Sequence, residues 1–158
     1  MRRTLGSIGI LLLLGVVVAW LEFCNKIEIA GHPRVVDGDS LELDGERIRL
    51  LGIDAPELAQ MCQRGGKAWA CGKAARHALR THIAGSDVIC RSTGEDQHGR
   101  WLAICRKDGQ EINGWMVQAG WAVDFGGYAI EEGRARRAKN GIWGSIFENP
   151  QEWRRNNR

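Results

Sequence analysis

One short part of the chain carries most of the side chains that can do chemistry. Asp39, Arg49, Asp54 and Glu57 stand close together in the sequence. Carboxylate oxygens are the ligands that Ca²⁺ and Mg²⁺ prefer, and the planar fork of an arginine matches two oxygens of a phosphate. If the fold brings these side chains together, they predict a site for a hard cation beside a site for a phosphate.

A predicted hairpin must position them. Apolar residues alternate with polar ones on both sides of Asp44-Gly45, a dipeptide that tolerates the positive φ angles of a two-residue type I′ turn. The resulting register places Ser40 opposite Arg49. Asp39, at the start of the first strand, then lies beside Arg49 on the second.

These residues and a third motif resemble the thermonuclease (staphylococcal nuclease) family. The motifs are Asp-Gly-Asp-Ser at 37–40, Arg-Leu-Leu-Gly-Ile-Asp-Ala-Pro-Glu at 49–57 and His-Gly-Arg at 98–100. Asp-Gly-Asp alone is a common turn, but the order and spacing of all three are specific, and the likeness runs from Arg34 to Trp153. The resemblance implies an α+β, mainly β, fold: a five-stranded OB-type barrel with three helices.

A single divalent ion, expected to be Ca²⁺, is assigned to the carboxylates of Asp39 and Asp54, because such an ion needs several oxygen ligands. The resemblance adds the backbone carbonyl of Ala55. Taken alone, Asp39 would be explained equally well by an Asx-type turn after Gly38. Its occurrence together with Asp54 and the neighbouring arginine favours a role in binding the ion.

Three side chains are the predicted catalytic groups: Arg49, Glu57 and Arg100. Glu57 would position or deprotonate the attacking water, although a carboxylate here also suits the first turn of a helix. The two arginines would hold the scissile phosphate as charge builds up on it, and ion pairs with nearby carboxylates are the plainer alternative. From the resemblance, Tyr128 is a candidate substrate contact by stacking on a base or contacting phosphate.

The composition suits one ordinary domain with one core, since the chain has 158 residues and 44% apolar content. Its net charge of +3 permits a polyanionic partner without requiring one. We expect a monomer whose parts are a signal anchor or signal peptide at 1–24, a linker at 25–33, the nuclease-like domain at 34–153 and a basic tail at 154–158. The arginines of the tail are expected to be solvated, with phosphate contact as the alternative.

The first residues predict export. An uncharged apolar stretch at 5–21 follows Arg2 and Arg3, and its length lies between those of a secretory signal and a membrane span. The arginines place the amino terminus in the cytoplasm. We favour an uncleaved inner-membrane anchor with the domain facing the periplasm. Cleavage after Ala19, giving a periplasmic or secreted protein, and lipid attachment at Cys24 are the alternatives.

Four of the five cysteines are predicted to form disulfides. Cys90 and Cys105 lie at equal distances from the turn of a second hairpin, which places them opposite one another. Cys62 and Cys71 form the other pair. Free buried thiols and a zinc site with nearby histidines are the alternatives, although the spacing matches no usual zinc pattern. Two disulfides would suit an oxidising compartment such as a periplasm.

Apolar spacing and terminal glycines predict helices at 66–83, 111–118 and 128–140, with strands at 87–91 and 101–106. The aromatic segment that follows the third helix is predicted to be a strap over the core.

The sequence therefore predicts a divalent-metal-dependent nuclease that hydrolyses the phosphodiester bonds of DNA and RNA. The alternative function is a non-catalytic OB-type module of the cell envelope that binds nucleic acid or an anionic polysaccharide. All the side chains needed for catalysis are present, which favours the enzyme.

Overall fold

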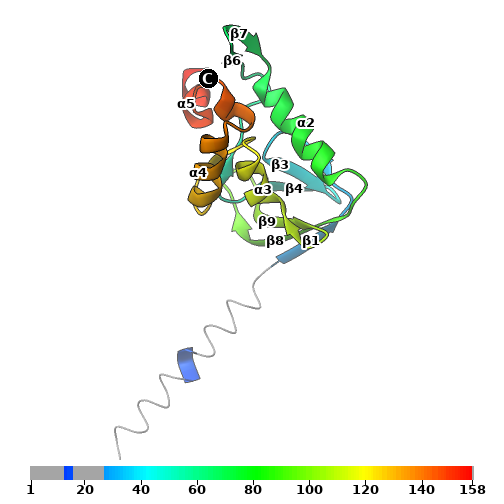
Figure 1. Ribbon diagram of the computed structural model, residues 1–158. Coiled ribbons are helices and arrows are strands. Elements are labelled where there is room, and N and C mark those ends of the chain that lie inside the picture. Colours follow the sequence, from blue (N-terminus) through cyan, green and yellow to red (C-terminus); the bar gives the residue numbers. More distant parts are fainter. Residues whose placement is uncertain (1–12, 16–26, 158) are drawn as a thin grey trace, which may run out of the picture.

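The computed structural model describes residues 13–15, which are helical, and residues 27–157 (Figure 1). The expected anchor at 1–24 lies almost entirely outside the described residues. Within them, no helix is both long enough and apolar enough to span a membrane. Anchoring and export therefore stay predictions.

A mixed sheet forms the centre of the fold, with strand order β1-β8-β9-β4-β3-β2 and β10 paired to β9. Its strands are β1 (Ile27–Gly31), β2 (Arg34–Val35), β3 (Ser40–Leu43), β4 (Glu46–Leu50), β8 (Val88–Glu95), β9 (Trp101–Lys107) and β10 (Gln110–Glu111). Neighbouring strands are antiparallel except β4 and β9, which are parallel. A mixed sheet with several helices fits the OB-like α+β fold that the resemblance implied, but this sheet has seven strands and not five.

Two further strand pairs and five helical segments surround the sheet. The pairs are β5 (Ile53–Asp54) with β11 (Val123–Asp124) and β6 (Cys62–Arg64) with β7 (Lys67–Trp69). The helical segments are α2 (Cys71–Ile83), α3 (Ile112–Gln118), α4 (Ala129–Ala138), the 3₁₀ turn η1 (Gly141–Gly144) and α5 (Pro150–Asn156). Figure 1 shows α5 at the same end of the molecule as the β6–β7 hairpin.

The three predicted helices are present, but the first begins at Cys71 and not at residue 66. Residues 62–69 instead form the β6–β7 hairpin, because Gly65 and Gly66 adopt positive φ angles of 56° and 76° and turn the chain. The sequence prediction missed α5, which begins where Asn149 caps it and Pro150 takes the first position.

Two segment boundaries also differ from expectation. The segment expected to be a linker, 25–33, contains β1, which pairs with β8 from Ile27↔Ser92 to Gly31↔Val88. The expected basic tail begins inside α5. Both segments are thus held by contacts with residues far away in the sequence, β1 by pairing with β8 and α5 by the bonds of Arg154.

The predicted first hairpin is confirmed in register and in turn. Ser40 lies opposite Arg49, and Leu41 lies opposite Ile48. Asp44 and Gly45 have φ angles of 49° and 84°, as the type I′ turn requires.

Two apolar clusters fill the interior. The larger lies between the sheet and helices α2 and α3, and buried Asn113 joins its layers by donating to the carbonyls of Leu51 and Ala103 and accepting from the N–H of Cys105. The smaller contains Cys62, Cys71, Val123 and Ile142, with Trp69, Trp143 and Phe147 packed against it. The segment after α4 therefore packs over this smaller cluster, as the predicted strap.

Both predicted disulfides are present: Cys62–Cys71 and Cys90–Cys105. Cys90 and Cys105 are directly paired across β8 and β9 and fully buried. A cross-link stabilises chiefly by restricting the unfolded chain, and the stabilisation grows with the length of the loop it closes.

Replacing Cys90 and Cys105 together with alanine should lower the free energy of unfolding by about 3 kcal/mol, because the link closes a separation of 15 residues. Urea unfolding of the oxidised double variant and of the oxidised parent protein measures this difference. Under full reduction the two proteins should differ much less. A loss below about 1 kcal/mol in the oxidised comparison would contradict the proposed contribution of the link.

Candidate active site

A cleft of about 550 Å³ lies where the first hairpin leads into β5. Its lining residues are Asp37, Asp39, Arg49, Ala55, Pro56, Glu57, Asp96, Gln97, His98, Arg100, Leu102, Phe125 and Arg154. Every predicted metal or catalytic residue except Asp54 is among them. Asp54 lies beneath the cleft, where it is 1% exposed and hydrogen-bonded to Arg49.

Arg49 joins the two carboxylates that were assigned to the ion. Its Nη1 donates to Oδ1 of Asp39 and its Nη2 donates to Oδ1 of Asp54, both at 2.9 Å. The second oxygen of Asp39 accepts the N–H of Ala55 at 2.9 Å. One arginine fork therefore fixes the start of β3, the end of β4 and the loop after β5 against one another.

The electrostatics of this group reflect its burial. Burial raises the pKa of Asp39 to about 7, an effect that Arg49 opposes and that the neighbouring carboxyl of Asp37 reinforces. Burial favours the neutral form of Arg49, but Asp39 and Asp54 outweigh it and raise the pKa of Arg49 above its usual value. Arg49 is thus always charged, and its guanidinium is the main group that favours the ionised form of Asp39 against the effect of burial.

Arg100 is held by a different carboxylate. Its Nε donates to Oδ2 of Asp96 at 2.8 Å, and its own N–H donates to Oδ1 of Asp96 at 3.0 Å. Burial alone would raise the pKa of Asp96, but these bonds and the N–H of His98 lower it to about 2. The ionised Asp96 orients the guanidinium of Arg100, which lines the same cleft as Glu57.

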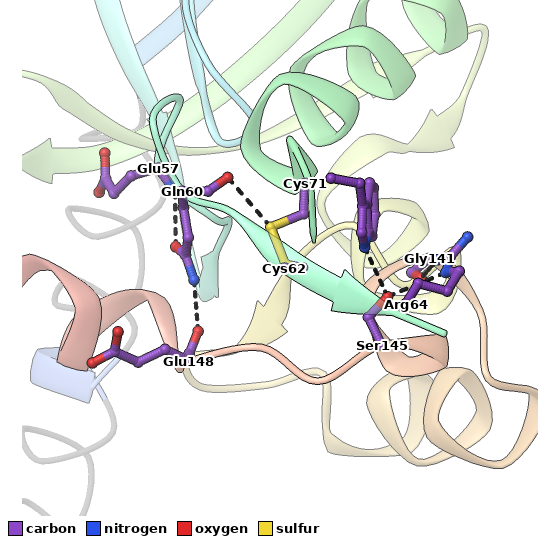
Figure 2. Close-up of a disulfide and its surroundings, with 9 residues drawn as sticks. Glu57, Gln60, Cys62, Arg64, Cys71, Gly141, Ser145 and Glu148 are labelled. Carbon is purple, nitrogen blue, oxygen red and sulfur yellow. Dashed lines mark hydrogen bonds between the residues drawn. A yellow bond between two sulfur atoms is a disulfide. The ribbon is translucent and has the colours of Figure 1, made fainter. Parts of the chain in front are cut away.

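Glu57 stands on a loop that packs closely against helix α2. A side chain in place of Gly72, in the first turn of α2, would place its Cβ 1.7 Å from the carbonyl oxygen of Glu57. The N–H of Glu57 is bonded to Oε1 of fully buried Gln60, whose Nε2 donates to the carbonyl of Glu148 at 2.7 Å. Figure 2 shows Gln60 between these two partners, beside the Cys62–Cys71 disulfide. The candidate general base therefore has a fixed backbone.

Arg154 is a site residue that the sequence prediction missed. From α5 its Nη1 donates to Oδ1 of Asp54 and to Oε1 of Glu57, and its Nη2 donates to Oδ2 of Asp54, all at 2.9 Å. These bonds raise its pKa above the usual value of an arginine, although burial opposes them. The only signal in the sequence was a group of arginines near the carboxyl end, which does not reveal the one that faces the site.

Tyr128 is not brought together with the other predicted residues. It lines a separate hollow with Gly114 and Trp115, and its hydroxyl donates to Oε1 of Glu111 at 2.7 Å. Burial and the bond to Glu111 raise its pKa. The aromatic side chain on the cleft is Phe125, which is 59% exposed. Gly126 and Gly127 lie between the two aromatic residues and both have positive φ angles, of 128° and 120°.

The donor chemistry of the cleft fits a hard divalent cation. Asp39, Asp54 and the carbonyl of Ala55 offer only oxygen, as Ca²⁺ and Mg²⁺ prefer. Within residues 13–15 and 27–157, no three side chains of His, Cys, Asp or Glu gather closely enough to hold an ion by themselves. Water would thus complete the coordination of an ion held by this set.

Comparison with known proteins identifies the family. Residues 47–145 match the family described as staphylococcal nuclease homologue. The chain belongs to the staphylococcal nuclease family. An uncharacterized endonuclease of Escherichia coli O157:H7 is 31% identical over 138 residues, which are 80% of this chain and 84% of that protein. A micrococcal nuclease of Shigella flexneri is 29% identical over 161 residues, covering 88% and 84%.

Another relative in this comparison has a different name. The succinoglycan biosynthesis protein ExoI of Rhizobium meliloti (strain 1021) is 37% identical over 123 residues, which are 73% of this chain and 64% of that protein. This chain thus spans less than two thirds of ExoI. Membership of the staphylococcal nuclease family supports a nuclease-type hydrolase, and the matched segment contains Arg49, Asp54, Glu57 and Arg100.

The bonds of Asp96 predict how stability depends on pH. A carboxyl whose pKa is lowered by folding contributes stability that is complete above its ordinary pKa of 3.8 and is lost as the pH falls towards 2. Between pH 5 and pH 2, Asp96→Asn should lose about 2 kcal/mol less unfolding free energy than the parent protein. Urea unfolding at several pH values measures this, with the exposed Asp87→Asn as control. Parallel pH profiles for Asp96→Asn and the parent would show that the bonds to Arg100 and His98 do not stabilise the fold.

Proposed function

We propose that this protein is an endonuclease that hydrolyses phosphodiester bonds in DNA and RNA with one divalent cation, Ca²⁺, in the cleft. The observation that carries the proposal is the convergence of Arg49, Glu57 and Arg100 on one cleft floored by Asp39 and Asp54. Nuclease relatives within the family support the same class of reaction.

Each polar group suits one part of such a reaction. The side chain of Glu57 is 33% exposed on the cleft, so its carboxylate can take a proton from a water that attacks phosphorus. Arg100, oriented by Asp96, offers donors to phosphate oxygens as negative charge grows on them. Arg49 lies deeper, with its side chain 18% exposed, and keeps Asp39 and Asp54 in place while adding positive charge beneath the phosphate. A cation held by Asp39, Asp54 and the Ala55 carbonyl would supply further charge to the phosphate.

The rim of the cleft supports an extended, flexible substrate. Phe125 presents an exposed ring on which a base can stack, and every base has such a face. Stacking of this kind needs bases that are not already paired within a duplex. We therefore expect single strands and frayed ends to be cleaved faster than intact duplex.

The full-length protein should cleave labelled single-stranded DNA in the presence of Ca²⁺, and a chelator should stop the reaction. Glu57→Gln and Arg100→Ala should each lower the cleavage rate by roughly a hundredfold or more, because each removes a group that acts on the transition state. The control is Arg91→Ala, an exposed arginine on β8 that lies outside the cleft. Unchanged rates in both site variants would reject these assignments, and thermal unfolding of each variant separates a lost fold from lost chemistry.

The alternative, a non-catalytic module for an anionic polysaccharide, has one supporting observation, the similarity to the succinoglycan biosynthesis protein ExoI. Under this alternative, calorimetry would detect saturable binding of purified succinoglycan while DNA stays intact with every divalent metal tested. The nuclease proposal predicts that succinoglycan does not bind saturably and that DNA is cleaved.

A further inference from the structure

The guanidinium of Arg154 makes an unusual set of contacts in the proposed nuclease site. It spans both oxygens of Asp54 and also reaches Glu57. Oδ1 of Asp54 accepts a second hydrogen bond from Arg49. Since a carboxylate oxygen has two lone-pair positions, this oxygen has none left for another partner.

This arrangement has a direct consequence for cation binding. An ion can use Oδ1 of Asp54 only if Arg49 or Arg154 gives up its bond. Arg49 has a side chain that is 18% exposed and is held by two carboxylates from within the fold, whereas that of Arg154 is 30% exposed and comes from a short helix near the carboxyl end. Arg154 also holds Oδ2 of Asp54, so its displacement frees a position on both oxygens, whereas displacement of Arg49 would free a position on Oδ1 alone.

Charge balance points to the same conclusion. Asp39, Asp54 and Glu57 carry up to three negative charges around one end of the cleft, and Arg49 offsets only one of them at close range. Arg154 supplies a second positive charge at hydrogen-bonding distance from two of these carboxylates. A cation near the same oxygens and the guanidinium of Arg154 would repel each other. The cation would also neutralise the carboxylates that Arg154 neutralises in its absence.

The chain holds α5 in place through specific bonds, so the contact of Arg154 is not that of a loose tail. Gln60 donates to the carbonyl of Glu148 just before α5, and the side chain of Asn149 caps the helix. Further back, Gln63 is bridged to Ile146. Figure 2 shows the Glu148 end of this attachment beside Gln60 and the disulfide.

We infer that Arg154 is an active-site residue that competes with the divalent cation for Asp54 and Glu57. The inference rests on the cation site of the proposed function. When the cation binds, the guanidinium leaves the carboxylates, and its position on the cleft wall leaves it beside the substrate phosphate. Without the cation, Arg154 is thus the counter-charge of Asp54 and Glu57. With the cation bound, it adds to the contacts with the phosphate.

The test measures Ca²⁺ affinity directly, by calorimetry on the full-length protein in non-ionic detergent. Arg154→Gln should bind Ca²⁺ about tenfold more tightly than the parent protein, which corresponds to ~1.4 kcal/mol. Arg154→Lys keeps the charge but cannot span both oxygens of Asp54, so its affinity should lie between the two. Arg155→Gln is the matched control, since Arg155 is on the same helix with a side chain that is 65% exposed, lies outside the cleft and should leave the affinity unchanged.

Thermal unfolding gives a second readout and shows whether each variant folds. Without Ca²⁺, Arg154→Gln should unfold at a lower temperature than the parent, and saturating Ca²⁺ should raise its unfolding temperature by more than it raises that of the parent. Equal or weaker Ca²⁺ binding in Arg154→Gln and Arg154→Lys would overturn the inference, as would no measurable binding in any variant. If the affinities shift as expected but DNA stays intact, the nuclease proposal fails and the competition stands.

Discussion

The buried pairing of Arg49 with Asp39 and Asp54 is the interaction on which both the fold and the site depend. Its three members come from the residue just before β3, from β4 and from β5, so the pairing fixes the part of the chain that surrounds the cleft floor. Removing one member of such a buried group leaves an uncompensated charge, which typically costs about 3–5 kcal/mol. In the proposed nuclease, stability and function therefore constrain the same side chains, and the positive charge that would lie under a phosphate is already present in the folded protein.

The sequence contained enough local information to predict this part of the structure. Asp44-Gly45 determines the turn, and alternation with period two determines which residues face each other, so the approach of Ser40 to Arg49 followed without knowledge of the remaining fold. The Cys90–Cys105 pair followed in the same way from symmetry about a turn. Both predictions involve neighbours in one hairpin, where chain geometry limits the possible partners.

Contacts between distant segments could not be obtained in this way. Arg154 reaches Asp54 across 100 residues of sequence, and nothing in the pattern of α5 distinguishes it from Arg155. The structure has Phe125 and not Tyr128 on the cleft. This difference depends on the path of the chain through Gly126 and Gly127, which both have positive φ angles. Helix spacing also predicted residues 66–70 as helix, since the composition of the β6–β7 hairpin is compatible with either state until the disulfide and the strap pack against it.

Gln60 connects two parts of the site that lie far apart in the sequence. Its buried amide uses one end for the N–H of Glu57 and the other for the carbonyl of Glu148, so it lies between the loop of the candidate base and the segment that leads to Arg154. Each of those backbone groups would cost about 1–3 kcal/mol if it were left buried without a partner. The chain therefore gains stability by keeping this amide in one orientation. Because Gln60 bonds to both segments, the fold sets how far apart the backbones at Glu57 and Glu148 lie, while the side chain of Arg154 stays free to change partner.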